Sequence, residues 1–354
     1  MDDKDRESTR RINLECSIKV KKEPSRKLRD VLGLCSECYL EDYYGVITGE
    51  MVSFDDKLID NIYDKLTDID VIRKFLNSLS ATEFNILMNI VDNGGCIQDD
   101  YIKYLDYSYI SRFGTIYKFN YKNKLYIVMP EEIVNVIKKI DTDSYNDIVV
   151  QNSIIIDLAT AMGNLYGVVP AGVFGKALDE YYGITDINLD CILYAKRSNG
   201  ISCIKYDDDN LYFVRDDFFE EDYKGNIFKI IDNYNDILCD FDFKKIEREE
   251  LIKYKDIFYY YKSKSSEQFA DYLTGYGLDE EGIEDIIASI VQTYKSDYVV
   301  SVSILNDIFS EYDVVLNESN YDELMVYVNN LVNDIPMWGN KGWTSKEIIL
   351  GKAF

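Results

Sequence analysis

Cysteines are the residues whose type and spacing come closest to a chemical site. Cys35 and Cys38 have the two-residue spacing of a zinc knuckle or a redox pair, and Cys16 is a possible third ligand. A structural zinc ion needs four ligands, but the chain has no second Cys-x-x-Cys pair and no histidine. A thioredoxin-type pair would follow a strand in a βαβ unit. Ordinary cysteines are therefore the favoured interpretation, and we expect no bound metal.

The complete absence of histidine from the 354 residues excludes several classes of chemistry. Histidine titrates near neutral pH and is the commonest metal ligand and a frequent general base. Without it the chain has no Ser-His-Asp or Cys-His nucleophile. Carboxylates, lysines and thiolates stay available, but no Asp or Glu lies in an apolar setting that would shift its pKa. We expect a protein that is not an enzyme and has no cofactor.

Two further motifs do not predict a site. The glycine-rich stretch 167–176 has Val173 after Gly172, where a phosphate-binding loop needs Lys and then Ser or Thr. The acidic clusters at 207–209, 216–217 and 220–222 lack the ligand spacing of an EF-hand and indicate a solvated surface.

Composition indicates a cytoplasmic protein with no membrane association. Seven cysteines at irregular spacing do not form a disulfide framework, which favours a reducing compartment. The N-terminus is charged and no apolar run in the sequence approaches the length needed to cross a bilayer.

The net charge of −25 is unevenly distributed. Residues 1–29 carry ten Lys or Arg against six acids, whereas the remainder carries 29 against 58. A body this acidic repels nucleic acid unless its cations are segregated on one face. The alternative is that the acidity only maintains solubility.

Periodicity predicts a mainly α protein with small β-hairpins, an α+β fold. After a basic arm over 1–30, expected to lack order, residues 31–79 show helical spacing. A capping box at Ser80-Ala81-Thr82-Glu83 begins a helix that ends at Asn93-Gly94-Gly95. Short helices are predicted over 99–105 and 107–113, followed by a hairpin over 115–129 and a helix from Pro130 to Ile140. This order resembles a winged helix over residues 80–145.

A second, similar pattern covers residues 150–240, with helices over 152–166, 170–182 and 187–197 and a hairpin over 201–214. We interpret the two as tandem winged-helix-like modules. Two unrelated segments that share common strand residues are the alternative.

The two hairpins differ in charge. Residues 101–124 contain five Lys or Arg against one acid, whereas residues 199–224 contain three against eight. If the first module contacts nucleic acid, its basic side chains would bind phosphates and two tyrosines would lie near the groove. These candidates are Lys103, Arg112, Lys118, Lys122, Lys124, Tyr107 and Tyr109. Lysines that keep an edge hairpin soluble are the alternative, and the acidic second module favours a protein partner.

The C-terminal region, 243–354, is predicted as helices over 244–261, 266–276, 280–294, 301–311 and 320–332. A second capping-box pattern, Thr344 to Glu347, then predicts a short helix from Lys346. Its segment 333–347 contains both tryptophans, Trp338 and Trp343, which are candidates for partner binding.

This segment, Asn-x-x-Pro-Met-Trp-x-Asn-x-Gly-Trp-Thr-x-x-Glu, resembles the C-terminal segment of a largely uncharacterised family of low-GC Gram-positive bacterial proteins. The resemblance extends over most of 55–348 and includes Tyr166-Gly167-Val168 after a capped helix and an aromatic-rich wing strand. It implies winged-helix-like modules. Members often carry a zinc-binding SEC-C motif or a SAP-like (Rho N-terminal-type) segment, but the paired cysteines of SEC-C are missing here, so metal binding does not carry over.

These features favour a non-enzymatic regulatory or adaptor protein with a protein partner and with nucleic-acid contact through the first module. The alternative is an acidic interaction module, such as a nucleic-acid mimic or a phage- or defence-related factor, that binds a basic partner.

Overall fold

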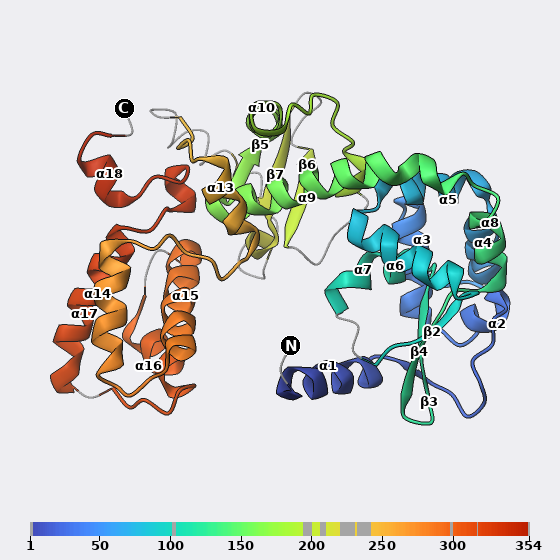
Figure 1. Cartoon of the computed structure of the whole chain (residues 1–354), viewed down its shortest axis with the longest axis horizontal. Coiled ribbons are helices and arrows are strands. Elements are labelled where there is room, and N and C mark those ends of the chain that lie inside the picture. The colour runs from blue at the N-terminus through green and yellow to red at the C-terminus, as the bar shows by residue number, and fades with distance from the viewer. Residues whose placement is uncertain are drawn as a thin grey trace. The chain divides into compact units, whose positions relative to one another are not determined.

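A computed structural model describes residues 3–100, 104–193, 200–205, 210–219, 231, 242–297, 300–316 and 318–352. The chain is mainly helical with two small sheets, as the periodicity predicted (Figure 1). It divides into two compact units: unit 1 comprises residues 1–156 and 186–199, and unit 2 comprises residues 157–185 and 200–354. The first division, after residue 156, falls within a single long helix, and the chain returns to unit 1 for residues 186–199. The sequence had suggested a boundary between residues 145 and 150.

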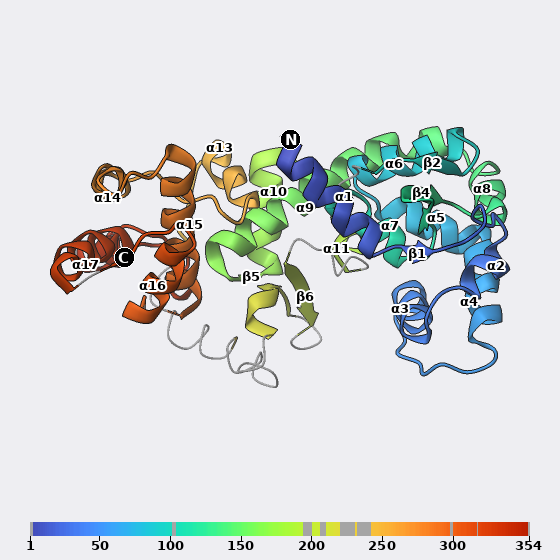
Figure 2. The same cartoon turned by 90° about the horizontal axis from the view of Figure 1, so that it is seen from below.

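The basic arm of unit 1 contains regular structure, contrary to the prediction that it lacks order. Helix α1, Asp3–Glu15, leads into the short strand β1, Ile18–Lys19. Figure 2 shows the chain passing from α1 into β1 beside the sheet of unit 1. The apolar Ile18 gives this polar segment an anchor, because it packs against the hydrophobic core of unit 1.

Amphipathic helices build most of unit 1, and they confirm the predicted helical spacing. They are α2 (Leu28–Leu32), α3 (Glu37–Thr48), α4 (Leu58–Thr67), α5 (Ile69–Ser78), α6 (Ala81–Asp92) and α8 (Glu131–Ile137). The capping box is confirmed at α6: the Ser80 side chain accepts a hydrogen bond from the backbone amide of Glu83, and the Glu83 side chain accepts one from the backbone amide of Ser80. The apolar faces meet in one core that includes Ile62, Phe75 and Leu87.

Four strands form the sheet of unit 1, in the order β1-β3-β4-β2. The predicted hairpin is present as β3, Tyr117–Tyr121, and β4, Lys124–Val128, joined by Lys122 and Asn123 with φ of 54° and 58°. Two consecutive positive φ angles are what the tightest hairpin turn requires.

The region before this hairpin contains a strand that was not predicted. Strand β2, Cys96–Gln98, pairs with β4, and helix α7, Tyr104–Arg112, lies further along the chain. Part of the helix predicted over 99–105 falls outside the described residues, because 101–103 are not among them. Gly95 sets up this pairing: its φ is 87°, and a Cβ there would lie 2.7 Å from the Met129 carbonyl oxygen. Only glycine allows the chain to come this close.

Helix α9, Asn146–Tyr166, begins in unit 1 after the 3-10 turn η1, Thr142–Tyr145, and ends in unit 2. In unit 1 the Asn152 side chain donates hydrogen bonds to two backbone carbonyls at the end of α5. The short helix α11, Asp190–Leu193, replaces part of the helix predicted over 187–197. Residues 142–166 are long and apolar enough for a membrane span, but 61% of that window is buried inside the protein, as in a core helix.

Unit 2 contains a three-stranded sheet of order β5-β7-β6. It consists of β5 (Val168–Pro170), β6 (Ile201–Lys205) and β7 (Leu211–Arg215), with α10 (Ala171–Tyr182) after β5 and the 3-10 turn η2 (Asp216–Phe219) after β7. The β6–β7 hairpin and α10 confirm the predictions, whereas β5 was not predicted. In both sheets the second strand of the hairpin is central: β4 lies between β3 and β2, and β7 lies between β6 and β5. The short outer strands β2 and β5 each precede a helix.

The C-terminal helices of unit 2 pack around their own core, centred on Phe269, Ile287 and Phe309. They are α14 (Lys264–Thr274), α15 (Glu280–Asp297), α16 (Val302–Ser310) and α17 (Glu318–Asn333), followed by the 3-10 turn η4 (Trp338–Asn340) and α18 (Ser345–Ile349). All of them had been predicted except η4.

The helix predicted over 244–261 is wrong. The structure has an extended segment over 242–247, then a short helix α13, Arg248–Leu251, and a 3-10 turn η3, Ile252–Lys255. Tyr166 and Tyr181 donate hydrogen bonds to the carbonyls of Lys244 and Ile246. These tertiary hydrogen bonds satisfy backbone groups that a helix would have used.

Lys295 of α15 is a buried charge in unit 2, with only 1% of its surface exposed. Its ammonium nitrogen has no hydrogen-bond partner in the described part of the chain and lies 5.3 Å from the centroid of the Tyr254 ring. Burial, together with the nearby Arg215 guanidinium, lowers the pKa of Lys295 to about 7. The unfolded chain therefore binds more protons than the folded protein between about pH 7 and the ordinary lysine pKa of 10.5.

This burial predicts that the free energy of unfolding rises as the pH increases from 7 to 9. We expect Lys295→Met to stabilise the protein by ~2–4 kcal/mol at pH 7, because it removes an uncompensated charge from the core. The difference from wild type should shrink toward pH 9. Urea unfolding at pH 7, 8 and 9 measures both effects, with exposed Lys176→Met as the control. Equal stability of Lys295→Met and wild type at pH 7 would contradict the prediction.

Candidate functional site

The basic arm and the hairpin of unit 1 lie side by side because β1 pairs in parallel with β3. Ile18 pairs with Phe119 and Lys19 with Asn120, and the Val20 amide donates to the Asn120 carbonyl at 3.1 Å. The pairing brings the exposed lysines around β1 next to the exposed lysines of the hairpin turn. We call this the arm–wing surface; it comprises Arg10, Arg11, Lys19, Lys21, Lys22, Lys122 and Lys124.

Helix α1 is attached to the same hairpin. The Arg10 guanidinium donates to the Asn123 carbonyl at the turn, at 3.0 Å, and its Nε lies 3.6 Å from Asp100. Asp100 in turn accepts the Leu125 amide, and its carbonyl accepts the Asn13 side chain. Through Asp100 the arm, the start of β4 and the end of β2 are connected by polar contacts.

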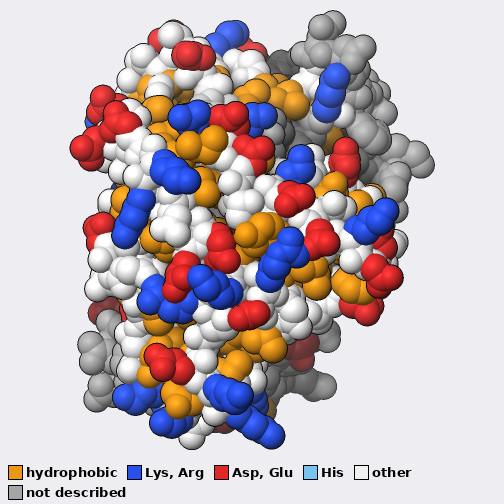
Figure 3. Space-filling view, turned by 90° about the vertical axis from the view of Figure 1, so that its right-hand side faces the viewer, with side chains coloured by type: hydrophobic (Ala, Val, Ile, Leu, Met, Phe, Trp, Pro, Cys, Tyr) orange, Lys and Arg blue, Asp and Glu red, His pale blue; other side chains and the backbone are white. Residues whose placement is uncertain are grey.

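The arm–wing surface is strongly basic in a chain that is otherwise acidic. Residues 10–23 carry five Lys or Arg against Glu15 and Glu23, and residues 115–128 carry three Lys and no acid. The two segments together have a net charge of +6, against −25 for the whole chain. Figure 3 shows Lys and Arg side chains gathered at the lower end of the face drawn there, at the height of the β3–β4 turn in Figure 1.

Two of the predicted nucleic-acid contacts lie on this surface. Lys122 and Lys124 are exposed at the hairpin turn. A hydrogen bond to the Tyr121 hydroxyl raises the pKa of Lys122, and its ammonium lies 4.8 Å from the Tyr121 ring centroid. Lys122 therefore stays positively charged at neutral pH, and both side chains are exposed where a phosphate could reach them.

Three other residues that were predicted to contact nucleic acid are buried, half-buried or ion-paired. Tyr109 is 4% exposed, and its hydroxyl shares a hydrogen bond of 2.8 Å with Ser78, so it belongs to the core. Arg112 forms an ion pair with Asp42 of α3 at 3.0 Å. Lys118 is half-buried, and burial lowers its pKa. Lys103 and the side chain of Tyr107 lie outside the described residues.

The cysteines are not brought together. Cys16, at the end of α1, lies near Lys118, whereas the Cys35 thiol is close to Tyr43. Burial raises the pKa of Cys35 to about 11, which leaves it a protonated thiol at neutral pH. Cys38 is exposed on α3. Within the described ranges no three Cys, Asp or Glu side chains are grouped closely enough to hold a metal ion.

Trp338 is not a free partner-binding side chain, contrary to the prediction. It is 4% exposed, and its indole nitrogen donates to the Asn164 carbonyl of α9 at 3.0 Å. Trp343 is half-buried and donates to the Asp242 carbonyl at 2.9 Å. Both tryptophans therefore hold the C-terminal segment against earlier parts of unit 2.

The two segments that carry the family resemblance contact each other in unit 2. A Cβ on Gly167 would lie 2.7 Å from Cγ of Trp338, and a Cβ on Gly342 would lie 2.5 Å from the Tyr166 ring. Within the tryptophan segment, Thr344 and Glu347 form the predicted capping box at the start of α18. Tyr166-Gly167 and the tryptophan segment thus form one packing arrangement, although they are far apart in sequence.

No family model, curated protein or solved structure matches this chain. Its function is therefore inferred from its own geometry and charge. The parallel pairing of β1 with β3 was the contact that sequence reasoning missed. The charge excess of residues 1–29 was the one signal that pointed toward it.

The contact between Gly167 and Trp338 predicts that Gly167→Ala strongly destabilises unit 2. Gly167 has a φ of 73°, and the added methyl group would overlap the indole, so we expect a loss of ~2–3 kcal/mol. The matched control is Gly172→Ala in α10, where a Cβ meets nothing within 4 Å. That substitution should be neutral or stabilise by ~0.5–1 kcal/mol. Urea unfolding compares the two, and similar values for both would contradict the role given to Trp338.

Proposed function

We propose that the chain is a non-enzymatic regulatory or adaptor protein that binds the phosphate backbone of a nucleic-acid duplex through the arm–wing surface. The observation that carries the proposal is the parallel pairing of β1 with β3, which joins the two basic segments of unit 1. Neither segment alone has more than a few cations. Together they offer seven Lys or Arg side chains on adjoining backbone segments.

The topology of unit 1 supports a winged-helix interpretation of this region. The elements follow the order α6, β2, α7, β3, β4, and β4 lies between β2 and β3. In winged-helix proteins the hairpin is the wing, and a wing with Lys122 and Lys124 at its tip is suited to contact phosphates beside a groove. The later segment runs α9, β5, α10, α11, β6 and β7, with one helix more before the hairpin, and that helix, α11, belongs to unit 1. Its sheet has the same strand arrangement as the sheet of unit 1, and this similarity is what supports the tandem interpretation.

The contacts offered are of the kind that position a protein rather than read bases. Lysines of the arm–wing surface would neutralise phosphates, which contributes affinity but no sequence information. On α7, the helix that would face the groove, Tyr109 is in the core and Arg112 is paired with Asp42. We therefore propose binding with little sequence preference.

The second module lacks a basic hairpin. Arg215, at the end of β7, is buried and paired with Asp217, and Asp216 accepts a hydrogen bond from Ser202. Residues 199–224 carry eight acids against three Lys or Arg. Such an acidic segment is unfavourable for binding a polyanion and suits a basic protein partner. We propose that unit 2 supplies the protein contact of the adaptor.

Fluorescence anisotropy with a short duplex DNA at 50 mM salt tests the nucleic-acid contact. We expect the affinity to fall steeply as salt increases, because each neutralised phosphate releases counterions. Replacing Lys19, Lys22, Lys122 and Lys124 by Glu should weaken binding at least tenfold and flatten the salt dependence. The same titration with duplex RNA shows whether the A-form geometry is accepted equally.

The control reverses Lys138 and Lys139, which are exposed at the end of α8 in the same unit, and it is compared with the charge-matched pair Lys122→Glu and Lys124→Glu. It should leave the affinity unchanged. An absence of binding at 50 mM salt, or an equal loss in the control, would overturn the proposal. Co-purification with a basic protein in the absence of duplex binding would instead favour the acidic interaction module.

A further inference from the structure

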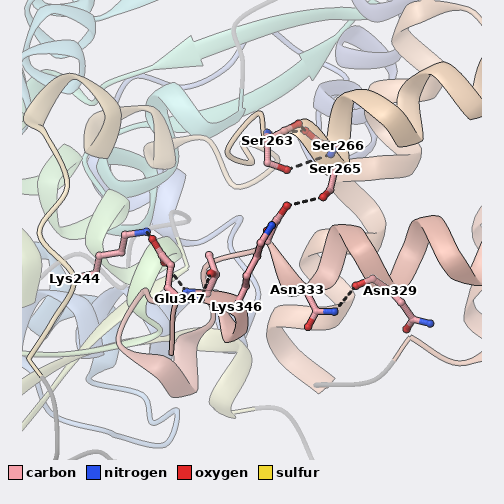
Figure 4. Close-up of polar contacts among 10 residues, drawn as sticks. Lys244, Ser263, Ser265, Ser266, Asn329, Asn333, Lys346 and Glu347 are labelled. Carbon is pink, nitrogen blue, oxygen red and sulfur yellow. Dashed lines mark hydrogen bonds and ion pairs between the residues drawn. The ribbon is translucent and has the colours of Figure 1, made fainter. Parts of the chain in front are cut away.

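Unit 2 contains a pocket of about 550 Å³ whose lining is rich in lysine. It lies between the extended segment 244–246, the start of α14 and the C-terminal segment, and Figure 4 shows part of its wall. Its volume is in the range of small-molecule sites. The lining contains six lysines: Lys244, Lys245, Lys262, Lys264, Lys346 and Lys352.

The charge of this pocket is opposite to that of the chain as a whole. Six lysines line it against three acids, Glu250, Asp334 and Glu347, whereas the chain has 39 Lys or Arg against 64 acids. Tyr261, which is 53% exposed, also lines the pocket and gives it aromatic surface, whereas Tyr254 is only 1% exposed. A cation excess in a net-negative protein concentrates anions at one place.

Carboxylates already occupy some of these lysines. Lys244 contacts both carboxylate oxygens of Glu347 at 2.8 Å (Figure 4). Lys346 contacts Asp334 at 3.0 Å. Lys245 and Lys262 pair with Glu180 and Glu284, which do not line the pocket. An anionic ligand would have to contact the same ammonium groups that these four carboxylates contact now.

Lys264 and Lys352 differ from the others, because neither has an acidic partner in the described part of the chain. Lys264 is also the first residue of α14, whose N-cap Ser263 accepts the Ser266 amide. The positive end of the helix dipole therefore adds to the charge of the lysines.

We propose that this pocket binds the phosphate groups of a small molecule. Phosphate suits the lining because each group carries up to two negative charges and three acceptor oxygens, and lysines bind it as point charges. Lys264 and Lys352 make the first contacts. Lys346 exchanges Asp334 for the ligand, so the carboxylate competes with phosphate for the same ammonium group.

Isothermal titration calorimetry of the full chain at low ionic strength, with inorganic pyrophosphate and with ADP as probes, tests this site. We expect saturable binding of both, and tighter binding of ADP because its base can stack on the exposed Tyr261 ring. Lys264→Glu combined with Lys352→Glu should weaken it at least tenfold. The control Lys176→Glu combined with Lys255→Glu changes the same charge in the same unit outside the pocket and should have no effect.

Asp334→Asn gives a test of opposite sign. Removing the competing carboxylate frees Lys346, so we expect pyrophosphate to bind several-fold more tightly, although the substitution removes an ion pair. Thermal unfolding without ligand shows whether each variant is folded. An absence of saturable binding for both probes, an equal loss in the control pair, or weaker binding by a folded Asp334→Asn protein would each overturn the proposal.

Discussion

A net charge of −25 is the constraint on which the binding properties of this protein depend. A polyanion or a phosphorylated ligand approaches such a chain only where folding separates cations from acids. Unit 1 achieves this with backbone pairing, because β1 brings the lysines of the arm to the hairpin turn. Unit 2 achieves it with a cavity lined by six lysines. In both cases tertiary structure brings together cations from separate parts of the sequence.

Local signals in the sequence predicted much of the fold. The capping boxes at Ser80 and Thr344 and both hairpins were located correctly, because each depends on residues a few positions apart. The failures depend on distant partners. Strands β1, β2 and β5 are two or three residues long and exist because of neighbours elsewhere in the chain. The segment 244–261 has helical spacing, yet side chains from α9 and α10 bind its backbone and keep its first part extended.

The candidate site was predicted less completely than the fold, for a related reason. Lysines at a polar turn are exposed in almost any arrangement, so Lys122 and Lys124 were identified from their position alone. Aromatic side chains serve equally as core residues or as contacts for a partner, and sequence does not separate these roles. Tyr109 is buried through its hydrogen bond to Ser78, and Trp338 is buried against Gly167. Both had been assigned to surfaces because their partners are distant in sequence.

The absence of histidine has a different meaning once burial is known. Histidine is the residue whose ordinary pKa lies near neutral pH, and the chain has none. Lys295 changes charge in that range instead, because the interior of unit 2 disfavours its ammonium form and lowers its pKa to about 7. It also lies close enough to Arg215, at the end of the β6–β7 hairpin, for the two charges to repel. Protonation of Lys295 therefore brings a second positive charge near the Arg215 guanidinium in the interior of unit 2.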